Sequence, residues 1–138
     1  LLMDRMSNRI YGKRRLSEFL PYPLLTILPP HQQDRWQTPL QLLANGPLQG
    51  LSRVGLIAAG TIRQKTEIHR QLLAAMMLGN PNAQLILCDT ELQSLGACDA
   101  LVLIAQGGAA SAAELEELVR HLDLQGGTVS GVILLHQP

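Results

Sequence analysis

The sequence predicts a three-layer α/β fold in which a mostly parallel β-sheet is flanked by helices. Short apolar runs without polar alternation are typical of strands buried on both faces, and residues 84–89 and 99–105 form such runs. Stretches with helical periodicity separate several of the apolar runs, which is the order expected for a parallel sheet. A chain of 138 residues, of which 46% are hydrophobic, can bury one core without disulfides or a metal.

The start of the chain predicts a weak helix and a strand. Residues 3–20 place a few apolar side chains among charged ones, and this pattern ends at Pro21. The apolar run 24–28 is bounded by prolines and predicts a strand. We divide the chain accordingly into a connector with the first strand, residues 1–30, and an α/β domain, residues 31–138.

A polar segment and a short helix follow. Residues 31–38 predict a surface loop in which Trp36 either anchors a contact or is an ordinary exposed aromatic side chain, and the second is the more common case. Pro39 suits the first turn of a helix. The breaker Asn45-Gly46-Pro47 predicts the end of that helix.

The rest of the chain alternates between strands and helices. Residues 54–59 predict a buried strand, and residues 64–79 predict a helix with one apolar face. Two more strands follow at 84–89 and 99–105. Ser111 and Glu114 have the spacing of a capping box, which predicts the start of a helix that continues to about residue 124. Residues 128–135 close the chain as a further strand.

The net charge of zero is the sum of two opposite halves. Residues 1–70 hold ten basic against four acidic residues, a balance of +6, and the remainder has a balance of −6. Cys88 and Cys98 lack metal-ligand spacing and are expected to be buried thiols. No apolar stretch is long enough to span a bilayer, and no pattern of a signal peptide is present.

The segment 59–66 has part of a phosphate-binding loop. Such a loop needs glycines that let backbone N–H groups wrap the phosphates, then a lysine, then a hydroxyl that holds Mg²⁺. Lys65 and Thr66 satisfy the last two positions, whereas Ala59 and Gln64 occupy the glycine positions and Gly60 comes one residue late. One interpretation is an irregular phosphate loop; the other is a strand-to-helix turn without a ligand.

Other candidate residues are less specific. Asp89 lies at the end of the strand predicted for residues 84–89 and is either a Mg²⁺-linked carboxylate or a strand-terminal acid. The histidines lack carboxylate or cysteine partners at motif spacing and are predicted to be non-catalytic: His31, His69, His121 and His136.

A basic cluster near the start suits an anionic membrane surface, to which each cationic side chain is attracted by about 1 kcal/mol. It comprises Arg5, Arg9, Lys13, Arg14 and Arg15. Nucleic acid is not expected as a partner, because the cluster lacks interleaved aromatic residues and a recognition module.

Several segments together resemble the cytoplasmic tyrosine-kinase-like domain of bacterial polysaccharide co-polymerases, the chain-length determinant proteins. These segments occur in the same order as in the family. The order is the connector after a membrane helix, the Walker A strand and loop, the strand that ends in an Asp-x-Asp motif, and the two final strands. In chain order they are residues 2–5, 16–30, 53–66, 85–92, 99–105 and 129–134.

The departures from this family concern catalysis. Between Leu92 and Asp99 the family has a Walker B strand with a Mg²⁺-holding aspartate, and here only residues 93–98 remain. Glu91 stands where the family has a second aspartate. Phosphoryl transfer depends on such positioning groups, so the resemblance implies a degenerate P-loop NTPase-like, Rossmann-like domain without catalysis and without a cofactor.

The resemblance also implies a role and a place. The chain is expected to act as a non-catalytic domain in the oligomer assembly of an exopolysaccharide chain-length regulator, at the cytoplasmic face of the inner membrane and within a longer membrane protein. The implied partners are further copies, the polysaccharide synthesis and export machinery, a separate tyrosine kinase and the membrane surface. One alternative is an active domain that binds ATP and Mg²⁺ through Gly60, Lys65, Thr66, Asp89 and Glu91; another is an unrelated α/β binding module.

Overall fold

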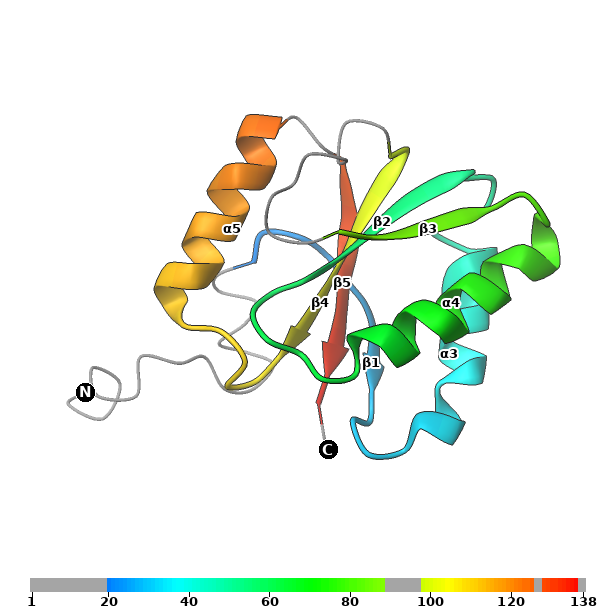
Figure 1. The fold of residues 1–138 in the computed structure, drawn as a ribbon, viewed down its shortest axis with the longest axis horizontal. Helices are drawn as coiled ribbons and strands as arrows, with labels where there is room; N and C mark the ends of the chain where they lie inside the picture. Colours follow the sequence, from blue (N-terminus) through cyan, green and yellow to red (C-terminus); the bar gives the residue numbers. More distant parts are fainter. Residues whose placement is uncertain (1–19, 89–97, 126–127, 137–138) are drawn as a thin grey trace.

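A parallel sheet forms the centre of the protein (Figure 1). The computed structural model describes residues 20–88, 98–125 and 128–136, and within them every paired strand is parallel to its neighbour. The strands lie in the order β1-β5-β4-β2-β3. This confirms the predicted α/β class with a parallel sheet. The strand bounds are Leu24–Leu28 for β1, Arg53–Ala58 for β2, Gln84–Cys88 for β3, Ala100–Gln106 for β4 and Val129–Leu135 for β5.

Helices lie on both faces of the sheet, with α3 and α4 on one side and α5 on the other (Figure 1). Strand β4 contributes to two separate cores because its side chains alternate between the faces. Val102 and Ile104 belong to the core beneath α3 and α4, whereas Leu101 and Leu103 belong to the core beneath α5. The helical bounds are Gln33–Arg35 for the 3₁₀ helix η1, Gln37–Asn45 for α3, Lys65–Gly79 for α4 and Ala112–Gln125 for α5.

Local sequence signals account for several of these boundaries. The capping box of α5 is present, because the Glu114 amide donates to the Ser111 hydroxyl and the Ser111 amide donates to the Glu114 carboxylate, each at 3.2 Å. Pro39 lies in the first turn of α3, as predicted, although this helix begins two residues earlier at Gln37.

The expectation that Trp36 is exposed is wrong. Its side chain is 0% exposed and belongs to the core beneath α3 and α4. The indole N–H donates a hydrogen bond to the Pro29 carbonyl oxygen at 2.7 Å. The burial of Trp36 could not be predicted from its polar neighbours in the sequence. Its hydrogen-bond partner follows β1 and its apolar contacts come from the core, so both lie outside that neighbourhood. The predicted surface loop also contains η1 and the start of α3.

The expectation that residues 84–89 form a strand covered on both faces is also wrong in part. Strand β3 lies at one edge of the sheet, and its residues Gln84 and Leu87 are exposed. Strand β1 lies at the opposite edge, where Ile27 is exposed. An apolar run of this length looks the same in sequence whether its strand is central or at an edge, so the run alone could not place it.

The amino ends of β2 and β4 are joined by Asp99. Its carboxylate accepts hydrogen bonds from the backbone N–H groups of Ser52 and Arg53, both at 3.0 Å. The Asp99 amide in turn donates to the Arg53 carbonyl oxygen at 2.7 Å. The aspartate that opens the 99–105 motif therefore has a structural function at the end opposite to the candidate phosphate loop.

We predict that Asp99→Ala lowers the free energy of unfolding by about 1 to 3 kcal/mol, because two backbone donors lose a charged acceptor. Urea unfolding followed by circular dichroism would measure this loss. Asp34→Ala, at an exposed position in η1, serves as the control and should leave the midpoint nearly unchanged. Equal midpoints for both variants would contradict the role of Asp99.

Candidate functional site

The candidate phosphate loop lies between β2 and α4, at the carboxyl edge of the sheet. Ligands in parallel α/β folds bind at this edge, so the position suits a binding site. Lys65 is the first residue of α4, Thr66 is the second, and both side chains are exposed, as is Gly60. The structure therefore brings these three predicted residues to one strand-to-helix turn.

Gly60 is packed against another part of the backbone. Its φ of +89° lies in the left-handed region that favours glycine. A Cβ atom at this position would lie 2.8 Å from the carbonyl carbon of Ala109, nearer still to its oxygen, and 3.0 Å from the Cβ of Ala110. A backbone carbonyl, which accepts hydrogen bonds, thus faces Gly60. A phosphate loop would instead present N–H donors at this point. The positive φ and the close approach to Ala109 account for the glycine without a bound phosphate.

Gln64 replaces the second glycine of a phosphate loop and is held by a different contact. Its side-chain amide donates to the Pro30 carbonyl oxygen at 3.4 Å, which joins the turn to the segment after β1. Gln64 is also the N-cap residue of α4, but its side chain makes no capping hydrogen bond. This arrangement favours the interpretation of a structural strand-to-helix turn over that of a phosphate cradle.

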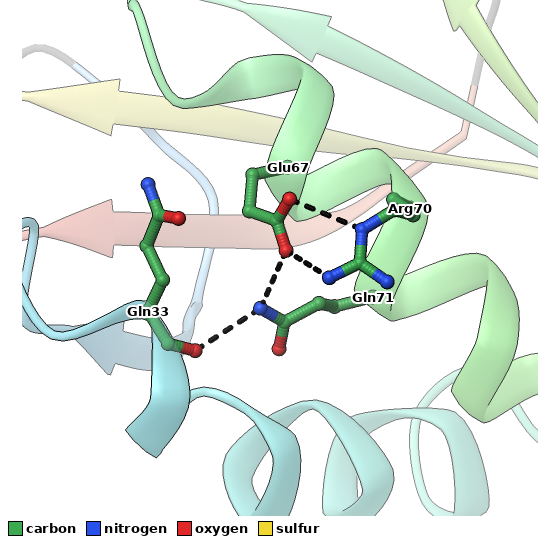
Figure 2. Close-up of polar contacts among 4 residues, drawn as sticks. All are labelled: Gln33, Glu67, Arg70 and Gln71. Carbon is green, nitrogen blue, oxygen red and sulfur yellow. Dashed lines mark hydrogen bonds and ion pairs between the residues drawn. The ribbon is translucent and has the colours of Figure 1, made fainter.

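An ionic network fixes the first turns of α4 to η1 (Figure 2). The guanidinium of Arg70 donates to both carboxylate oxygens of Glu67, and Gln71 donates to Glu67 at 2.8 Å and to the Gln33 carbonyl at 3.0 Å. The hydrogen bond from Arg70, followed by that from Gln71, holds the pKa of Glu67 below its ordinary value. A carboxylate therefore already lies in the first turn of α4, where the helix dipole favours an anion, and it disfavours a bound phosphate.

The remaining predicted site residues lie outside the described parts of the chain. They are Asp89 and Glu91 of the nucleotide set and the basic cluster Arg5, Arg9, Lys13, Arg14 and Arg15. Among the described residues, no group of three His, Cys, Asp or Glu side chains is arranged to hold a metal ion. No helix in the same ranges has the length and hydropathy to cross a membrane.

The two cysteines form no disulfide, and both sulfur atoms lie near Gly55. A Cβ atom on Gly55 would lie 3.3 Å from the Cys88 sulfur and 3.2 Å from the Cys98 sulfur. Cys88 is buried, as predicted, and Cys98 is half-buried. Burial, followed by the neighbouring Cys88 thiol, raises the pKa of Cys98. Both cysteines therefore behave as packing groups around Gly55.

Two histidines that look scattered in the sequence come together in the structure. His31 follows β1 and His136 follows β5, and both line one pocket at the carboxyl ends of these neighbouring strands, together with Arg35. Sequence spacing carried no signal of this arrangement, because the pairing of β1 with β5 joins segments that lie more than one hundred residues apart.

No protein-family model, curated protein or solved structure matches this chain. The resemblance to polysaccharide co-polymerases thus rests on the sequence motifs alone.

We predict that Gly60→Ala lowers the free energy of unfolding by about 2 kcal/mol or more, because the methyl group meets the Ala109 carbonyl and the backbone keeps a positive φ. Gly79→Ala is the matched control: nothing lies within 4 Å of a Cβ there, and the residue ends α4. Thermal unfolding would compare the two variants. A Gly60→Ala protein as stable as Gly79→Ala would show that the turn is open enough to admit a ligand.

Proposed function

We propose that this chain is a non-catalytic, degenerate P-loop NTPase-like domain of an exopolysaccharide chain-length regulator, and that it acts in oligomer assembly at the cytoplasmic face of the inner membrane. The order of family-like segments along the chain supports the kind of protein. The parallel α/β sheet supports the class of fold that this family would need.

The observation that carries the non-catalytic proposal is the closed turn after β2. Phosphoryl transfer depends on positioning donors and Mg²⁺ around the phosphates. Here a carbonyl oxygen faces Gly60, and the Gln64 side chain is bonded to Pro30. The Glu67 carboxylate, which is paired with Arg70, already lies in the first turn of α4. Each of these groups opposes or replaces a contact that a nucleotide would need.

The active alternative is supported by the two residues that the turn retains. Lys65 and Thr66 are exposed at the start of α4, and among the described residues no acidic side chain forms an ion pair with Lys65. With Gly60, and with Asp89 and Glu91, they are the set through which ATP and Mg²⁺ would bind. Nucleotide titration therefore separates the two functions.

The distribution of charge supports assembly between copies. Arg63 and Lys65 are exposed at the turn after β2, whereas Glu114, Glu116 and Asp123 are exposed on α5, which covers the other face of the sheet. Surfaces of opposite charge on one chain favour head-to-tail contacts between neighbouring chains. The basic cluster at the start would hold such an assembly on anionic lipid.

We predict that Mg-ATP does not bind this chain at millimolar nucleotide, because the turn lacks a cradle of donors. Isothermal titration calorimetry would measure binding to the wild type, to Lys65→Ala and to the control Arg120→Ala on α5. A micromolar affinity that Lys65→Ala abolishes and Arg120→Ala preserves would establish the active alternative.

We also predict that the chain self-associates at low ionic strength and dissociates as salt is raised, because screening weakens contacts between exposed charges. Sedimentation velocity over a salt series would measure the change in mass. Glu116→Lys on α5 should weaken association, whereas Gln49→Lys, which adds positive charge at an exposed site away from α5, should not. A monomer at every salt concentration would refute the assembly role.

A further inference from the structure

A pocket of about 610 Å³ lies where the carboxyl ends of β1 and β5 meet the start of α3. We name it the corner pocket. Its volume falls within the range typical of sites for small molecules. One part of its wall is polar and basic, and another is apolar. The polar part includes His31, Arg35 and His136, and the apolar part includes Ile27, Pro29 and Pro39.

Buried contacts hold the wall of the corner pocket in place. The Pro29 carbonyl accepts hydrogen bonds from the Trp36 indole at 2.7 Å and from the Gln32 amide at 3.3 Å. The His136 amide donates to the Leu28 carbonyl at 3.1 Å, which extends the pairing of β5 with β1. Since the Trp36 side chain is fully buried, the turn that carries His31 and Arg35 is anchored to the core rather than lying loosely over it.

The charge of the corner pocket is positive. None of the described residues that line it is acidic. The guanidinium of Arg35 makes no ion pair or hydrogen bond with a side chain of the described residues, and its neighbour Asp34 lines two other pockets instead. A guanidinium presents a planar fork of donors that matches carboxylate and phosphate oxygens. Imidazole rings beside it supply further N–H donors.

We propose that the corner pocket binds a small organic anion, a carboxylate or a phosphate ester with a compact apolar body. Arg35 contacts the anionic group, with His31 and His136 as additional donors. The apolar body packs against Ile27, Pro29 and Pro39. This site does not depend on the proposed function, because none of its lining residues belongs to the set that would bind ATP. It adjoins the turn after β2, since His31 also lines a neighbouring pocket with Arg63 and Gln64.

Titration of the intact chain, followed by chemical shifts in nuclear magnetic resonance spectra, would test the site with three probes that share a phenyl ring. Phenyl phosphate and benzoate carry the anion, and benzyl alcohol is the neutral match. We expect millimolar binding of at least one anion and much weaker binding of the alcohol. Preference between phosphate and carboxylate identifies the anionic group. Equal binding of all three probes, or no binding of either anion at millimolar concentration, would overturn the proposal.

Substitutions locate the binding. Arg35→Gln should lower the affinity for the anion roughly tenfold, which is the loss expected for one charge-assisted contact. Arg120→Gln removes the same charge from α5 and should leave the affinity unchanged. His136→Gln keeps a polar group and should weaken binding less than Arg35→Gln. Circular dichroism of each variant checks folding, and a folded Arg35→Gln protein with wild-type affinity would refute the role of this pocket.

Discussion

The fold depends on the attachment of β2 to β4 at both of its ends. At the amino end, the Asp99 carboxylate accepts from two consecutive backbone N–H groups. At the carboxyl end, the Ala59 amide donates to the Ile104 carbonyl at 2.8 Å, and Gly60 then lies directly against Ala109. Strand β2 also pairs with the edge strand β3 and leads into α4. The two attachments therefore help to position β3 and α4 as well as β2.

The same attachment brings the loop after β4 against the turn that has the sequence of half a phosphate site. A nucleotide needs room between the strand-to-helix turn and the loops of neighbouring strands. In this protein the loop after β4 lies against Gly60, which permits the close approach because it has no Cβ. Lys65 and Thr66 lie at the start of the helix, as their spacing predicts, but the nearby Gly60 packs against the backbone of Ala109.

Much of the fold could be predicted from local signals. The capping box of Ser111 and Glu114 and the helical spacing before Gly79 depend on neighbours within a few residues, and both helices lie where these signals indicate. The edge position of β3 and the burial of Trp36 depend on contacts with distant segments, which periodicity cannot register. The contact of Gly60 with Ala109 spans nearly fifty residues, so the sequence could suggest the loop but not its closure.

The strand order also constrains the sequence in which the strands can pair during synthesis. Strand β5 is the last strand in the sequence, yet in the sheet it lies between β1 and β4. During synthesis from the amino end, the partner that β1 has among the described strands is missing until residues 129–135 have left the ribosome, while β2, β3 and β4 can already pair. Pairings of such long sequence separation form slowly, because the entropy of closing the intervening chain must be overcome first. Strand β5 thus joins the edge strand β1 to the rest of the sheet.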